Sequence, residues 1–233
     1  MKERSSIAKI PKHIAFIPDG NRRKAIRDGI SIQDTYLVGA KKGLEVIGWC
    51  RELGVKHWTG FGASHENILK RSHEYMIPFF GGTLQLCLDV AKIPGVTLHI
   101  FGDIVGISNA IPSDYKREFL KLQRQGRPEG KFVVHVGINY SASADLRAFA
   151  GNARRTTQDV MSVGLHDLLM SAGVPDVDLL VRTGGKQRLS GFLTYQLRYS
   201  ELYFLPELWS DFSRANFDRA LEWYAEQDRN FGE

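Results

Sequence analysis

The chain lacks the long hydrophobic run that a membrane-spanning helix requires. None of its apolar stretches approaches about 18 consecutive residues. The first twelve residues are charged and have no apolar core of the kind found in signal peptides. We therefore expect a protein without stable membrane insertion, located in the cytoplasm, with a flexible N-terminal arm over residues 1–12 and a single domain over residues 13–233.

Cysteine is scarce, and no cysteine or histidine spacing matches a metal motif. Cys50 and Cys87 are the two cysteines, and both stand in apolar, helix-like patterns, so we predict buried thiols. The seven histidines form neither HxxxH nor HExxH, which argues against a zinc site built by the protein alone. The Walker motif and the GxGxxG motif are also missing, so nothing supports nucleotide binding.

Charge of one sign is not concentrated anywhere in the chain. The net charge is +5 and the pI is about 9.2, but the densest basic run is only Arg22-Arg23-Lys24. Aromatic residues are not interleaved with basic ones, as a stacking surface for nucleic acid requires. We expect no nucleic-acid partner. A basic cleft for a small polyanion explains the charge equally well.

Short apolar segments alternate with longer amphipathic ones. The predicted strands are His13–Pro18, Val55–Phe61, Val96–Phe101, Phe132–Ile138, Leu179–Arg182 and Leu202–Leu205. The predicted helices are Asp34–Leu53, Glu66–Lys92, Ser113–Gln125, Ala144–Val163 and Asn216–Asn230, and Pro78 should kink or break the second. This alternation is typical of an α/β fold with a central, mostly parallel six-stranded sheet flanked by helices.

The ends of the strands indicate where a ligand binds, because open parallel sheets bind ligands beyond their carboxyl edge. After the first strand comes Asp19-Gly20-Asn21-Arg22-Arg23. Gly20 permits a tight turn, the amides of the following helix start can face an anion, and Asp19 can hold Mg²⁺ against phosphate oxygens. The segment taken alone fits equally well a helix-capping aspartate followed by solvated arginines.

A second group of anion-binding residues follows the fifth predicted strand. Arg182, Arg188 and Ser190 surround Gly184-Gly185, and arginine forks suit phosphate oxygens. The alternative is a surface loop with exposed arginines. Two such groups in one α/β domain indicate two phosphorylated ligands held side by side.

Several blocks together resemble the cis-prenyltransferases, the undecaprenyl diphosphate synthase family, over nearly the whole chain. They are His13–Asn21, Ser64-x-Glu66-Asn67, Asn139-Tyr140, Arg182–Ser190, Ser200–Phe204 and Trp209–Phe212. The resemblance implies a homodimeric, Mg²⁺-dependent prenyltransferase that joins isoprenoid diphosphates, with residues 13–233 as its catalytic domain.

The resemblance also implies a role for individual residues. Asp19 and Glu201 would be the metal-linked carboxylates, and Asn67 would lie near the reacting centre. The donor diphosphate would be held by Gly20, Asn21, Arg22, Arg23, Ser64 and Arg71 (or Lys70). The acceptor diphosphate would be held by Arg182, Lys186, Arg188 and Ser190.

The sequence departs from the usual family pattern near both diphosphates. Tyr36 stands where the family usually has His, and Lys186 stands where it usually has Glu. These changes resemble the lavandulyl-type subgroup, which couples head to middle. We therefore favour dimethylallyl diphosphate as acceptor with geranyl diphosphate as donor, giving isosesquilavandulyl diphosphate; a dimethylallyl donor is also possible. Tyr36 and a bound diphosphate oxygen are both candidates for the proton acceptor.

Two other functions stay open at this point. One is regular cis chain elongation with isopentenyl diphosphate, and the other is a non-catalytic subunit that binds prenyl diphosphates. In the family, the region of Met76, Pro78, Phe79 and Phe80 lines the product tunnel, so bulky residues there would limit the product to a short chain. Ordinary core packing explains the same residues.

Overall fold

The computed structural model describes residues 9–107, 111–126, 129–157 and 159–228. Its centre is one six-stranded sheet in the order β3-β4-β2-β1-β5-β6, and every neighbouring pair is parallel. The strands are β1 (His13–Ile17), β2 (His57–Ser64), β3 (Thr97–Phe101), β4 (Val133–Tyr140), β5 (Leu179–Arg182) and β6 (Glu201–Phe204). The predicted fold class is confirmed.

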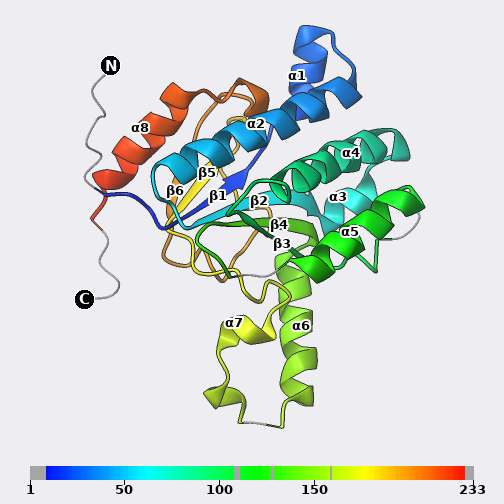
Figure 1. Ribbon diagram of the computed structural model, residues 1–233, viewed down its shortest axis with the longest axis vertical. Coiled ribbons are helices and arrows are strands. Elements are labelled where there is room, and N and C mark those ends of the chain that lie inside the picture. The colour runs from blue at the N-terminus through cyan, green and yellow to red at the C-terminus, as the bar shows by residue number, and fades with distance from the viewer. Residues whose placement is uncertain (1–8, 108–110, 127–128, 158, 229–233) are drawn as a thin grey trace.

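One face of the sheet is covered by four helices, which form the main core with it (Figure 1). They are α2 (Ile32–Glu52), α4 (His73–Val90), α5 (Ser113–Gln125) and α8 (Arg214–Ala225). Helix α2 begins at Ser31, whose hydroxyl accepts a hydrogen bond from the Asp34 N–H at 3.0 Å, and Gly54 follows its end with φ 79°. The short α1 (Asn21–Asp28) and α3 (His65–Lys70) directly follow β1 and β2.

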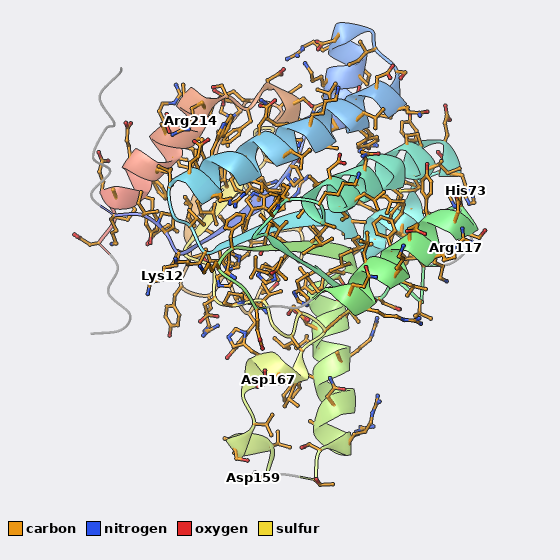
Figure 2. The ribbon with its side chains drawn as sticks, viewed as in Figure 1. Lys12, His73, Arg117, Asp159, Asp167 and Arg214 are labelled. Atoms are coloured by element: carbon orange, nitrogen blue, oxygen red, sulfur yellow. The ribbon has the colours of Figure 1, made fainter. Side chains whose placement is uncertain are left out.

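The other face is covered mainly by the loop-rich segment around residues 174–197, whose apolar side chains form a smaller core with β1, β2 and β5. Helix α6 (Ala142–Arg155), the 3₁₀ turn Val160–Ser162 and α7 (Leu165–Leu168) project from this side (Figure 1). Asp159 and Asp167 mark the projecting part in Figure 2. Within α6 only Asp145 is buried.

The prediction of one helix over Glu66–Lys92 is wrong, because the segment contains two helices. It consists of α3 and α4, which are separated at Arg71–Ser72, whereas Pro78 lies inside α4 without ending it. Ser64 and Ser72 are the N-cap residues, so helix-start signals divide the segment. Pro78 removes a single backbone hydrogen bond near the exposed beginning of α4, and burial of Met76 and Phe80 outweighs that loss.

Two other boundaries also differ from the prediction. Helix α6 ends at Arg155 rather than Val163, and α8 ends at Ala225, while residues 229 and 230 lie outside the described part. Of the predicted arm, residues 1–8 lie outside the described residues, and Ile10 packs against the core.

Both cysteines are buried, as predicted, and burial raises the pKa of the Cys87 thiol to about 12. No helix in the described residues is long and apolar enough to cross a membrane.

Candidate active site

The topology brings the two predicted anion-binding groups together. Strand β1 pairs with β5 so that Ile17 lies beside Arg182, and both strands therefore end at the same place on the carboxyl edge. Two residues further on, Asp19 Oδ2 accepts a hydrogen bond from Arg182 Nη2 at 3.0 Å. The Arg182 side chain is only 4% exposed. A partly buried ion pair thus joins the two segments.

Asp19 also contacts the helix that follows it. Its Oδ1 accepts a hydrogen bond from Arg23 Nη2 at 3.2 Å, and Arg23 Nη1 donates to the Gly184 carbonyl at 2.7 Å. Thr183 adds two hydrogen bonds: its hydroxyl accepts from the Asp19 N–H at 3.0 Å and donates to the Asp19 carbonyl at 2.8 Å. The main chain of Asp19 is therefore fixed, and its carboxylate is oriented by two guanidinium groups.

The capping alternative for Asp19 is not what the structure shows. The N-cap of α1 is Gly20, which has φ 114°, and a Cβ at this position would meet Leu208 Cδ2 at 2.8 Å. Glycine is required here both by conformation and by space. Asp19 consequently points to Arg23 and Arg182 and leaves the amides of the first turn of α1 uncapped by any side chain.

The second loop is arranged around Arg182. Its Nη1 donates to the Arg188 carbonyl and to Ser190 Oγ, the latter at 3.0 Å. Ser190 has φ 54°, a conformation that non-glycine residues seldom adopt outside turns and functional loops. Lys186 and Arg188 are exposed on the same loop. The structure therefore brings the Arg182 side chain to the Arg188 carbonyl and the Ser190 hydroxyl, with Lys186 in the loop between them.

Tyr36 and Arg71 lie near each other and near Arg22. Burial raises the pKa of Tyr36, while the charges of Arg71 and Arg22 oppose that rise. Burial lowers the pKa of Arg71, which also feels the charges of Tyr36, Arg22 and Asp19. The ring of Tyr36 packs edge-on against Phe79 with 5.2 Å between centroids. Tyr36 is thus placed between cationic side chains and an apolar wall.

Ser64 and Asn67 lie at the end of the neighbouring strand β2. The buried Ser64 caps α3: its hydroxyl accepts a hydrogen bond from the Asn67 N–H at 3.1 Å. Asn67 lies in the first turn of that helix. Both residues are therefore at the carboxyl edge of the sheet, where they were predicted to be.

Several basic side chains of the site have no partner within the described part of the chain. Arg22, Arg71, Lys186 and Arg188 make no side-chain hydrogen bond or ion pair there, whereas Arg23 and Arg182 share Asp19. Such an excess of positive charge around one carboxylate attracts a polyanion. The arrangement suits two diphosphate groups better than any neutral ligand.

A cavity of about 510 Å³, partly open to solvent, begins next to these charges. It runs between the sheet and the helices α2 and α4. Its lining is mainly apolar and glycine-rich: Pro18, Asn21, Tyr36, Gly39, Ala40, Gly43, Trp58, Gly60, Phe61, Gly62, Phe79, Gly82, Thr83, Leu86, Val136 and Trp209. Phe79 faces this cavity as the sequence suggested, but Met76 and Phe80 belong to the core.

The predicted metal ligands are not brought together within one chain. Glu201 begins β6 and pairs with Leu179, three residues before the Arg182–Phe204 pair at the carboxyl edge. It therefore lies toward the opposite end of the sheet from Asp19. No group of three metal-binding side chains occurs among the described residues. The Asp19 carboxylate, about 30% exposed between arginines, fits Mg²⁺ only in the way that ion often binds, through one carboxylate plus substrate phosphate oxygens.

Sequence reasoning missed two contributors to the site. Thr183 fixes the main chain of Asp19, and Trp58 lines the cavity. The six-membered ring of Trp58 lies over Gly60, where a Cβ would be 2.4 Å from Cη2. The spacing Trp58-x-Gly60 on a strand could have indicated this contact, because alternate residues of a strand share one face.

The fold and the site together define a class: an α/β protein with a cationic edge for diphosphate groups and an adjoining apolar cavity for a hydrocarbon tail. The family model described as "Putative undecaprenyl diphosphate synthase" matches residues 17–232. The chain therefore belongs to the undecaprenyl diphosphate synthase family, the cis-prenyltransferases, and is a prenyltransferase.

Relatives and solved structures agree with this assignment. An isoprenyl transferase from Fusobacterium nucleatum is 31% identical, over 96% of each chain. A tritrans,polycis-undecaprenyl-diphosphate synthase (geranylgeranyl-diphosphate specific) from Pyrococcus abyssi is 30% identical, over 96% of this chain and 87% of the relative. Lavandulyl diphosphate synthase from Lavandula x intermedia, solved with dimethylallyl diphosphate, has a TM-score of 0.78 and 25% identity, over 96% and 98% of the two chains.

Proposed function

We propose that this prenyltransferase performs irregular, head-to-middle coupling of dimethylallyl diphosphate with an allylic donor. Geranyl diphosphate is the favoured donor, which gives isosesquilavandulyl diphosphate, and dimethylallyl diphosphate is the second candidate. The observation that carries the proposal is the charge of the acceptor loop, where Lys186 joins Arg182 and Arg188. The structural likeness to a lavandulyl diphosphate synthase supports it.

The residues of the site supply the steps of such a coupling. The donor C1–O bond breaks and its electron pair leaves with the diphosphate, whose charge Arg22, Arg23 and Arg71 stabilise. The acceptor double bond then attacks C1, and the resulting cation loses a proton to form the new double bond. A diphosphate oxygen takes that proton, either directly or through the Tyr36 hydroxyl, which passes its own proton on because its raised pKa keeps it protonated.

Mg²⁺, when bound, would neutralise charge on the departing diphosphate. In this proposal Asp19 holds it together with diphosphate oxygens. Glu201 lies on the edge strand β6, so its predicted role in metal binding requires a different arrangement from a single chain, such as the homodimer that we also propose.

Regular elongation with isopentenyl diphosphate is the main competing function, because the named relatives include undecaprenyl diphosphate synthases. A non-catalytic partner subunit is the other. Incubation of the protein and Mg²⁺ with dimethylallyl plus geranyl diphosphate, and separately with isopentenyl plus geranyl diphosphate, distinguishes all three. The alcohols obtained after dephosphorylation are then identified by mass spectrometry.

A branched C15 alcohol from the first mixture supports head-to-middle coupling. A linear product obtained only from the second mixture would contradict it, and no product from either mixture favours the partner subunit. Two variants test the cause of the regiochemistry. We expect Lys186→Glu and Tyr36→His to lower the yield of branched product from dimethylallyl plus geranyl diphosphate and to raise the yield of linear product from isopentenyl plus geranyl diphosphate; unchanged products in both mixtures would eliminate both residues as determinants of the regiochemistry.

A further inference from the structure

Helix α1 is held to the protein almost without apolar packing. None of its residues is buried, and Ile26 is 84% exposed. Gly20 and Gly29, with φ 114° and 64°, bound the helix on both sides. Helix α1 lies at the beginning of α2, at the margin of the helical layer (Figure 1). Segments with so little buried surface open more easily than the core.

Among the residues that the structure describes, two carboxylates provide the ionic contacts between α1 and the rest of the protein. Asp19 contacts Arg23 near the start of the helix. Asp211, in the 3₁₀ turn Trp209–Asp211, contacts the next turn: Lys24 Nζ lies 2.8 Å from its Oδ1, and Arg27 Nη1 lies 2.7 Å from its Oδ2. Hydrogen bonds from Arg27 and Lys24 hold the pKa of Asp211 below its usual range, which keeps it charged.

The same helix carries two residues of the donor site, Arg22 and Arg23. We propose that Asp211 is a positioning residue, which docks α1 and so places Arg22 and Arg23 at the diphosphate. Lys24 and Arg27 lie on one side of the helix, three positions apart, so their contacts with Asp211 fix the rotation of α1 about its axis. The part of this proposal that concerns the donor rests on the proposed function.

Ion pairs within α1 explain why the loss of Asp211 should release the helix. Asp28 accepts hydrogen bonds from both Lys24 and Arg27 at 2.6 Å. When Asp211 no longer attracts them, these two cations retain a partner on their own helix. The helix can therefore separate from the turn that holds it, and an eight-residue helix without that contact opens more often.

The first test is amide hydrogen exchange of the free protein. In Asp211→Asn we expect the amides of residues 21–28 to exchange about tenfold faster, the order expected when two partly exposed ion pairs are lost from a segment with no buried residues. Asp218→Asn is the matched control. Asp218 has a similar exposure of 34% and pairs with Arg214 at 2.8 Å on α8, away from α1. It should leave exchange in α1 unchanged.

The second test is affinity for inorganic diphosphate, measured by calorimetry without prenyl substrate. We expect Asp211→Asn to weaken it about tenfold and Asp211→Glu, which keeps the charge, to recover most of the loss. Unchanged exchange in α1 would overturn the docking, and faster exchange with unchanged diphosphate affinity would overturn the positioning role. Neither readout needs turnover, so both outcomes stand apart from a failure of the proposed coupling reaction. If coupling occurs, Asp211→Asn should raise the donor KM and leave the acceptor KM unchanged.

Discussion

At the scale of single residues, Asp19 has two opposing effects on a diphosphate. Its carboxylate orients Arg23 and Arg182, but its charge repels the anion that these arginines attract. Asp19→Asn should therefore bind inorganic diphosphate more tightly in the absence of metal, while turnover falls by about 100-fold, the order of loss when one group of a charge-stabilising set is removed. Calorimetry and steady-state kinetics measure the two effects.

A control for Asp19→Asn is Asp176→Asn, since Asp176 pairs with Arg198 on the surface at 2.6 Å. It should change neither quantity. If Asp19→Asn turned over substrate at the rate of the unmodified protein, the assigned role of Asp19 would be wrong.

Trp58 should limit the length of the hydrocarbon tail. Its indole lines the cavity and lies against Gly60, and its Nε1 has no hydrogen-bond partner among the described residues. Trp58→Phe therefore loses no hydrogen bond, and its smaller ring leaves more room in the cavity. We expect the ratio of kcat/KM for farnesyl over geranyl diphosphate to rise about tenfold, the discrimination that a hydrophobic pocket gains or loses by small changes in size.

The comparison with Trp49→Phe makes the cavity prediction specific. Trp49 packs against Phe212 and Phe217 outside the cavity, so the same substitution there should leave the ratio unchanged. Product lengths are read by gas chromatography with mass spectrometry. An unaltered preference in Trp58→Phe would show that another residue limits the tail.

The residues of the site could be predicted to the extent that they follow strands directly. Asp19 and Arg182 each stand at the end of a strand, and the parallel sheet brings such ends together. Contacts made across the fold left no comparable signal. Thr183 is one short polar residue among many, and the ion pairs of Asp211 join positions 184 and 187 residues apart.

At the scale of secondary-structure elements, histidines from four neighbouring strands lie side by side on one face of the sheet. His13, His57, His135 and His99 belong to β1, β2, β4 and β3. His57 Nδ1 lies 3.1 Å from His135 Nε2, and His99 Nδ1 lies 2.9 Å from His135 Nδ1. Burial lowers the pKa of His13 to about 3 and that of His99 to about 4.

This row of histidines predicts that the fold weakens in acid. The folded state binds these protons less readily than the unfolded chain, so the stability they contribute is complete above about pH 6.5 and is lost as the pH falls toward 4. From pH 7.5 to 5.0 we expect a loss of about 2 kcal/mol for each of His13 and His99. Urea unfolding at several pH values measures it.

Replacement of one histidine should reduce this pH dependence. Below pH 6, His99→Asn should reduce the slope of the unfolding free energy against pH by about the contribution of one proton. His73→Asn, on the exposed start of α4, should leave that slope unchanged. A slope that stays the same in His99→Asn would contradict the assignment.

The type and order of the elements could be read from the sequence better than their boundaries. Alternation of apolar and amphipathic segments defined all six strands: β1, β4 and β5 are buried on both faces, and the edge strand β6, although only partly buried, is still a short apolar segment. The division of residues 66–92 into α3 and α4 is harder to read from the sequence, because Ser72, which begins α4, is a weaker local signal than Pro78, which lies inside it. The end of α6 was missed because the part that projects has little burial to mark it.

At the scale of the whole molecule, the projecting α6 indicates a surface made for a partner. A 14-residue helix that buries only Asp145 gains little stability from its own chain. Leu146 and Met161 are 69% and 90% exposed. We expect a homodimer, with about twice the chain mass of 26.3 kDa in light scattering. Leu146→Glu should shift the protein toward monomer.

Val105→Glu is the matched control for that variant. Val105 is 70% exposed in the loop after β3, away from α6, so its substitution should leave the mass unchanged. A monomeric mass for the unmodified protein would contradict the dimer, and a dimer that survives in Leu146→Glu would move the interface elsewhere.

Binding in the cavity beside Asp19 should change the fluorescence of the tryptophans that line it. Of the four tryptophans, Trp58 and Trp209 line the cavity, whereas Trp49 and Trp223 do not. A prenyl tail that enters would contact the first pair and leave the second pair unaffected. We expect an emission shift with prenyl diphosphates that inorganic diphosphate does not produce and that Trp58→Phe diminishes. Tail binding and head-group binding can thus be followed as separate signals in the unlabelled protein.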